Sequence, residues 1–66
     1  MDHYTKQEVA IDILINRIAK TMKKIEETND ETLKEELDLL LEARELLYKG
    51  DEKMIERIIG EKNGEE

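Results

Sequence analysis

The 66-residue sequence contains no cysteine, proline, tryptophan or phenylalanine, and it has a single histidine. Disulfides are therefore excluded, and His3 alone does not provide the four ligands of a structural zinc site. A domain this short buries only about 60% of the surface that its unfolded chain exposes, so it commonly depends on disulfides, a metal or a partner subunit. With the first two excluded, the sequence favours association with a second chain.

Several function classes lack their usual sequence features. No apolar run approaches the roughly 20 residues that cross a bilayer, and the N-terminus shows no export signal. The absence of cysteine is compatible with a cytoplasmic location. No cysteine or serine is present as a nucleophile, the glycines are isolated rather than clustered in a phosphate loop, and the acidic stretches lack the pattern of a calcium loop. We therefore expect a cytoplasmic protein that is not an enzyme and that binds no metal or other cofactor.

What is present is a helical pattern along the whole chain. Thr5 and Glu8 have the spacing of a capping box, in which each side chain accepts from the other residue's backbone amide. This motif predicts that a first helix begins at residue 6, and its apolar periodicity extends to residue 27. Asn29 suits a left-handed position after the helix, and Asp30 suits the cap of the next one.

The second half of the chain is interrupted by glycine. A second helix is predicted over residues 31–49, where Gly50 ends it. Asp51 is the predicted cap of a short third helix over residues 52–59, which Gly60 ends. We expect one domain over residues 1–60, followed by a disordered acidic tail over residues 61–66.

Apolar residues recur every three or four positions, which is the spacing of one helical face. The short linker predicts that the first two helices are antiparallel neighbours, with the third folded over their open end. The sequence therefore indicates an all-α fold, an antiparallel helical hairpin plus a short third helix. The predicted contact faces are Ile11, Leu14, Ile15, Ile18, Met22 and Ile25 on the first helix, and Leu33, Leu37, Leu40, Leu41, Leu47 and Tyr48 on the second.

A second set of apolar residues lies off these faces, and a lone hairpin cannot cover both sides of its second helix. We expect this set to form a homodimer interface around a four-helix-bundle-like core. Two alternatives remain open: a three-helix monomer in which the third helix covers the patch, and a groove for a different protein. The predicted interface consists of Val9, Ile13, Leu39, Ala43, Arg44 and Leu46.

Arg44 breaks the apolar pattern because it falls opposite Ile15. Its aliphatic stem can lie along apolar surface while its guanidinium reaches Asp12 or Glu8. Alternatively, it is a polar group that sets the register of a dimer.

The charges are segregated, although their sum of −7 opposes nonspecific binding to nucleic acid. The second helix carries an acidic ridge, and the simplest interpretation of both charged faces is that they are solvated. The basic face of the first helix is nevertheless a candidate RNA-binding surface. Its candidate residues are Lys6, Arg17, Lys20 and Lys24, and the acidic ridge consists of Glu31, Glu35, Asp38, Glu42 and Glu45.

The segment Thr5-Lys6-Gln7-Glu8 and the turn at Asn29 and Asp30 resemble the repressor-of-primer family of plasmid copy-control proteins. The resemblance implies a four-helix homodimer that binds paired RNA loops through its first helices. By position it implies a binding face of Lys6, Ile13, Arg17 and Thr21, with Arg17 standing where the family has an aromatic stacking residue.

The segment Glu36-Leu37-Asp38 resembles the second helix of the small aspartyl-phosphate phosphatases of sporulating bacteria. Lys34 and Glu35 stand where that family has serine and glutamine. This resemblance implies that Asp38 is the functional carboxylate and that the partner is a phosphorylated response regulator.

Taken together, the sequence favours a small acidic interaction protein, a homodimeric adaptor or inhibitor with a possible further protein partner. Its usage of lysine, glutamate and isoleucine suggests a low-GC bacterium or its phage or plasmid. The two alternatives are an RNA-binding copy-control regulator and a phosphatase-like regulator of a response regulator. No small-molecule substrate and no membrane is expected.

Overall fold

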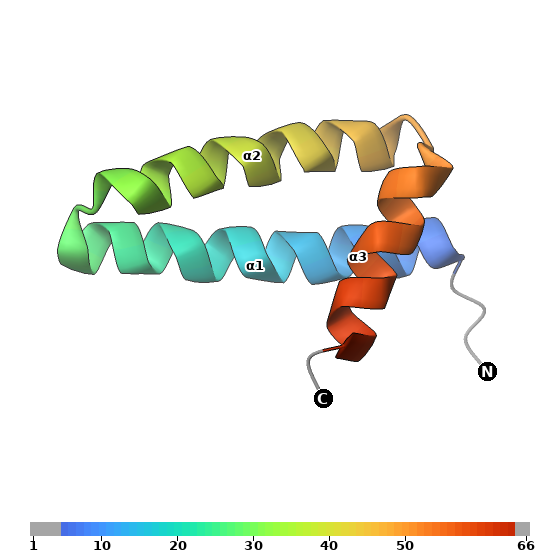
Figure 1. The fold of residues 1–66 in the computed structure, drawn as a ribbon, viewed down its shortest axis with the longest axis horizontal. Helices are drawn as coiled ribbons and strands as arrows, with labels where there is room; N and C mark the ends of the chain where they lie inside the picture. Colours follow the sequence, from blue (N-terminus) through green and yellow to red (C-terminus); the bar gives the residue numbers. More distant parts are fainter. Residues whose placement is uncertain (1–4, 65–66) are drawn as a thin grey trace.

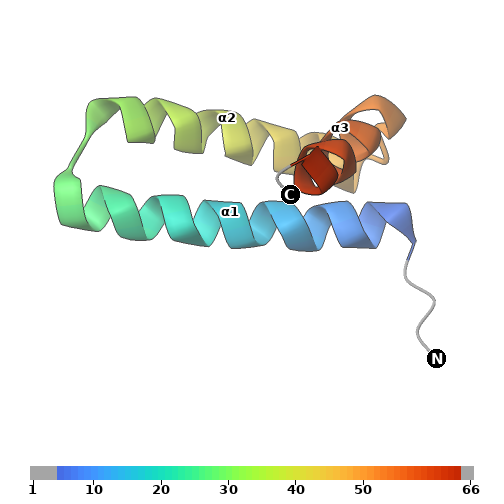
Figure 2. The same cartoon turned by 60° about the horizontal axis from the view of Figure 1, so that its bottom comes forward.

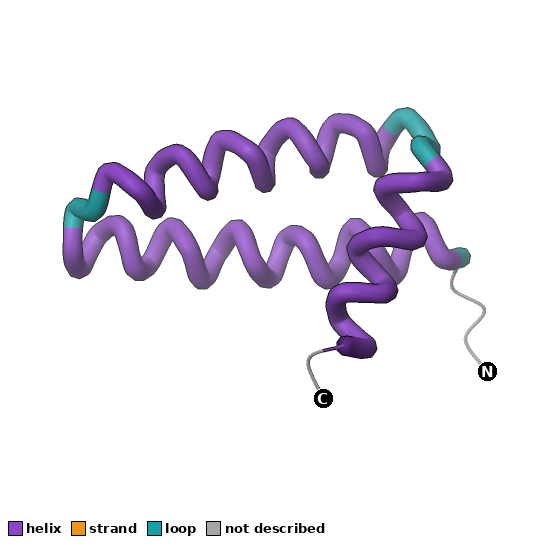
Figure 3. Tube along the Cα trace, viewed as in Figure 1, coloured by secondary structure: helices purple, strands orange, loops and turns teal. Residues whose placement is uncertain are grey.

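The computed structural model describes the backbone of residues 5–64 and the side chains of residues 5–61. Within this part of the chain it contains α1 (Lys6–Thr28), α2 (Glu31–Tyr48) and α3 (Glu52–Gly64), and no strand. Figure 1 shows α1 and α2 side by side, with α3 crossing one end of this hairpin, and Figure 3 shows the short loops that join the three helices. The predicted all-α hairpin with a third helix is confirmed.

Both ends of α1 have the predicted caps. The Glu8 amide donates to Thr5 Oγ1 over 3.1 Å, and the Thr5 amide donates to Glu8 Oε1 over 3.1 Å, which completes the capping box. At the other end Asn29 is left-handed, with φ of 54°, and its amide donates to the Ile25 carbonyl. Asn tolerates this conformation better than most residues, so the chain reverses here and α2 runs back along α1.

The connection from α2 to α3 is also built by local hydrogen bonds. Gly50 has a φ of +82°, which a residue with a side chain rarely adopts. The Asp51 amide donates to the Leu46 carbonyl and the Gly50 amide donates to the Leu47 carbonyl, both over 3.0 Å, and this pair of bonds is the Schellman motif. Asp51 Oδ1 then accepts from the Met54 amide over 2.9 Å, so Asp51 caps α3 as predicted.

The prediction that the third helix ends at Gly60 is wrong, because α3 continues to Gly64. Gly60 lies inside the helix with free space around it. Two ion pairs of Glu61 stabilise this extension. Glu61 Oε1 accepts from Arg17 Nη1 of α1 over 2.7 Å, and Glu61 Oε2 pairs with Arg57 Nε, one turn earlier in α3, over 3.4 Å. Of the predicted disordered tail, residues 61–64 are helical, while residues 65–66, like His3, lie outside the described residues.

The core lies where α3 crosses the hairpin. Leu14 of α1 and Leu47 of α2 are fully buried there, and α3 covers them with Ile55 and Ile58. Figures 1 and 2 show that α3 covers only one end of the hairpin, so the other end is a two-helix segment. The whole buried apolar cluster is Ala10, Leu14, Ile18, Ala43, Leu47, Ile55 and Ile58.

The predicted contact face of the hairpin is partly wrong. Ile15, Met22 and Tyr48 were assigned to it, but their exposed fractions are 44%, 51% and 57%. The physical reason is that α1 has to pack against two helices. Ala10 and Thr21, which are small, are buried instead, so the buried face of α1 is turned toward α3 and away from Ile15.

Among the described residues, no helix has the length and apolar character that a passage through a membrane requires.

Candidate interaction surface

The hairpin has two sides, and α3 covers one of them. Residues two apart in a helix point about 200° away from each other. On α1, Arg17 marks the α3 side because it pairs with Glu61, so Ile15 points to the other side. On α2, Leu39 and Leu46 line a groove against α3, so Leu37 and Tyr48 point to the other side.

We call this second side the open face. It combines residues from both helices of the hairpin at helical spacing. Three of its large side chains are the exposed ones described above, and two more are half-buried against the core. Among the residues whose side chains are described, only a few large apolar ones are exposed, and three of them, Ile15, Met22 and Tyr48, lie here. The open face consists of Ile15 and Met22 from α1 and of Leu37, Leu41, Arg44 and Tyr48 from α2.

Arg44 lies in the middle of the open face and is half-buried. Its guanidinium carbon lies 5.9 Å from the centre of the Tyr48 ring, within the range of a cation–π contact. Its Nε is buried and has no hydrogen-bond partner among the described residues. The expected contact of Arg44 with Asp12 or Glu8 is absent from the ion pairs of the described residues.

The interface residues proposed from the sequence fall mainly on the α3 side. Ala43 is wrong as an interface residue because it is buried in the chain's own core. Ile13 is half-buried against that core, and Leu46 is half-buried in the groove that α3 lines. The third helix therefore covers part of the apolar set that the sequence assigned to a dimer interface, as in the three-helix alternative. Leu39 remains 65% exposed and Val9 remains 39% exposed, although Leu39 borders the groove that α3 lines.

The structure brings together three of the four candidate RNA-binding residues. Arg17, Lys20 and Lys24 line one hollow between α1 and α2, which also contains Glu36 and Glu61. Lys6 lies nearer the N-terminus and pairs with Glu56 over 3.4 Å. The Arg17 guanidinium, which donates a hydrogen bond to Glu61, lowers the pKa of that carboxyl, so the two groups share an ion pair at the edge of the hollow.

The acidic ridge of α2 is solvent-exposed along its whole length. Among the residues that the structure describes, its one ion pair is local, between Glu31 and Lys34 over 3.3 Å. Asp38, the carboxylate implied by the phosphatase resemblance, is one of these exposed residues. The described part of the chain has no group of three His, Cys, Asp or Glu side chains that could hold a metal ion.

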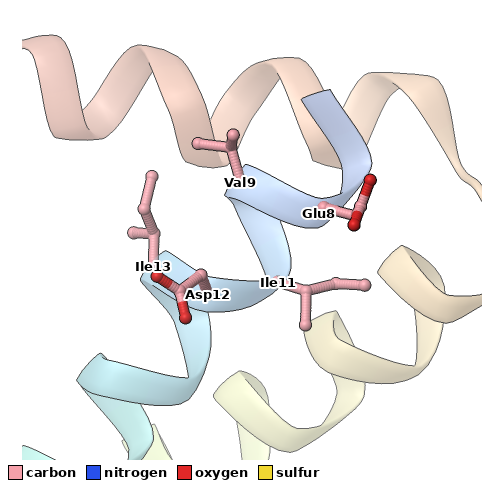
Figure 4. Close-up of a pocket in the computed structure, with 5 residues that line it drawn as sticks. All are labelled: Glu8, Val9, Ile11, Asp12 and Ile13. Carbon is pink, nitrogen blue, oxygen red and sulfur yellow. The ribbon is translucent and has the colours of Figure 1, made fainter. Parts of the chain in front are cut away.

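A shallow hollow at the start of α1 is lined by residues of that helix alone. Figure 4 shows that their side chains point in different directions around α1 and do not converge. Glu8 is also occupied by the helix cap. The hollow therefore lacks the convergent polar groups of a small-molecule site. Its lining residues are Glu8, Val9, Ile11, Asp12 and Ile13.

The sequence pattern did not reveal the open face, because the apolar spacing assigned the residues of the open face to the contact between the first two helices. A signal was present in Ala10 and Thr21, which also lie at helical spacing with Leu14 and Ile18. Small residues let a crossing helix approach closely, and two of them on one face indicated that this face meets α3.

Comparison with known proteins found no family model that matches the chain and no similar curated protein or solved structure.

Proposed function

We propose that this chain is a non-enzymatic protein-interaction module that functions as a homodimer through its open face. The carrying observation is that Ile15, Met22 and Tyr48 are about half exposed on one side of the hairpin. Fully burying a large apolar side chain contributes about 1.5–3 kcal/mol. In a twofold dimer each of these positions is buried in both copies, so the gain is substantial for a chain of this size.

The composition supports the same proposal. A 66-residue chain without disulfides has few other means to add buried surface. The other side of the hairpin is partly covered by α3, so the open face, which holds three of the exposed large apolar side chains among the described residues, remains for a second copy. The proposed interface therefore differs from the one suggested by the sequence, although the homodimer is the same.

The test is the mass of the particle in solution, measured by light scattering coupled to size exclusion at tens of micromolar. We expect a dimer for the unmodified chain and a monomer for Ile15→Glu, because burying the introduced carboxylate in the interface costs free energy. Leu39→Glu is the matched control, since Leu39 is more exposed than Ile15 but lies on the α3 side. It should remain a dimer.

A monomeric unmodified chain overturns the proposal. A monomer for Leu39→Glu, together with a dimer for Ile15→Glu, would move the interface to the α3 side. Circular dichroism of both variants confirms that each one remains helical.

RNA binding is the second candidate, favoured by the hollow that Arg17, Lys20 and Lys24 share. Cations placed together can follow a phosphate backbone, and such binding weakens as salt rises. We expect Lys20→Glu with Lys24→Glu to abolish a low-salt mobility shift of two complementary hairpin-loop RNAs, whereas Lys23→Glu, outside the hollow, should leave it intact. No shift of these RNAs by the unmodified chain at low salt would end this candidate.

A further inference from the structure

The open face contains a polar group that the single chain does not satisfy. Arg44 Nε is buried without a hydrogen-bond partner among the described residues. The Tyr48 ring, whose centre lies 5.9 Å from the guanidinium carbon, attracts the cation but is not a hydrogen-bond partner of Nε. Arg44 as a whole is only half-buried, and none of the described ion pairs includes it. Since polar groups at buried sites are nearly always paired, the accessible part of this guanidinium can take a carboxylate from a second chain.

Asp12 is a carboxylate of suitable charge at the border of the same face. It precedes Ile15 by three residues, so it lies within about 60° of Ile15 around α1. Asp12 is exposed, and no ion pair or hydrogen bond holds it among the described residues. It is also level with Arg44 along the hairpin, because Leu14 and Ala43, their near neighbours in sequence, line one groove together.

We propose that in the homodimer Arg44 of each copy donates to Asp12 of the other copy. This inference rests on the proposed function, because it requires the dimer. A twofold axis parallel to the hairpin places α1 of one copy over α2 of the other at the same level. Arg44 of each copy then faces the edge of the other copy that carries Asp12, so the dimer has two such pairs.

A twofold axis across the hairpin gives a different result. It would place α1 of one copy on α1 of the other and α2 on α2, so Arg44 of one copy would not meet Asp12 of the other. The two ion pairs therefore select one orientation of the dimer, as buried polar groups do in some helical assemblies. They also select the partner, since a surface without a carboxylate at this position leaves Arg44 unsatisfied.

A charge exchange between two variants tests the pairing. Arg44→Asp alone places two carboxylates against each other at both sites, and Asp12→Arg alone places two guanidinium groups against each other. In an equimolar mixture of the two variants, each site of a mixed dimer has one group of each sign. We expect each variant alone to dimerise about 100-fold more weakly than the unmodified chain, and the mixture to form mixed dimers with most of the original affinity.

The readout is light scattering for mass and native mass spectrometry for the composition of the dimers. Glu35→Arg is the control, because Glu35 is exposed and lies two residues before Leu37, so it points away from the open face, and it should dimerise like the unmodified chain. If a single variant does not fold, the chain that carries both Arg44→Asp and Asp12→Arg gives the same test, since it restores both pairs in its own homodimer.

The outcomes separate the two proposals. An unmodified chain that is monomeric overturns both. An unmodified dimer whose single variants dimerise normally, or whose variants fail to pair when mixed and when combined in one chain, overturns the Arg44–Asp12 pairing and leaves the proposed dimer intact.

Discussion

Leu47→Ala and Leu39→Ala are the same change at two sites on α2 with opposite surroundings. Leu47 is fully buried between the three helices, whereas Leu39 is 65% exposed. Truncating a buried leucine costs about 2–5 kcal/mol, because apolar contacts are lost and a cavity is left. A chain of this length has a total stability of roughly 3–10 kcal/mol, so Leu47→Ala removes a large part of it.

The expected difference is easily measured. For a domain of this size, one kcal/mol shifts the melting temperature by about 4–8 °C, so Leu47→Ala should lower it by roughly 10–40 °C. Leu39→Ala should change stability by less than about 0.5 kcal/mol, as exposed positions usually do, which is a shift of a few degrees. Thermal and urea unfolding followed by circular dichroism gives both values, at several protein concentrations to separate folding from dimerisation.

Equal destabilisation by the two substitutions would refute this account of the core. A large loss at Leu39→Ala that grows with protein concentration would show that Leu39 is buried between copies. That result would also contradict the placement of the dimer on the open face.

Further predictions concern the ends of α3. Gly50→Ala should destabilise the chain by about 1–2 kcal/mol, since Gly50 has a φ of +82°. Gly60→Ala should instead stabilise it by up to about 1 kcal/mol, because Gly60 is inside a helix with open space around it. Unfolding curves of the two variants check this pair, and a loss of stability at both sites would contradict it. The pKa of Glu61 is lowered from 4.5 by its hydrogen bond to Arg17, so this group stabilises the fold above about pH 4.5 and the gain is lost as the pH falls through the lower, folded value. Glu61→Gln should therefore be less stable than the unmodified chain at pH 7 and similar to it at pH 2, and a difference in stability that is unchanged at pH 2 would refute the ion pair.

The ends of the helices were predictable because each depends on a few adjacent residues. The cap at Thr5, the left-handed Asn29 and the glycine turn at Gly50 satisfy backbone groups within one turn of the chain. Gly60 is the exception, because it is also followed by Glu61, whose ion pair with Arg17 is a contact between distant parts of the chain. The end of α3 was therefore decided by a residue far away in sequence.

The contents of the candidate surface were less predictable. Sequence spacing identified more apolar residues than one hairpin can bury, and it identified Arg44 as the polar exception among them. It did not identify which set is covered, because Leu37 and Leu39 are equally apolar and lie on opposite sides of one helix. Only the position of α3 distinguishes them.

The sequence by itself determined three helices, their caps and an excess of apolar faces, since these follow from hydrogen bonds and periodicity within single segments. Tertiary structure alone decided which face is left outward. The crossing of α3 buries Ala43 and Ala10 and turns Ile15 and Tyr48 to the surface, because a helix between two neighbours must bury the side that faces both of them.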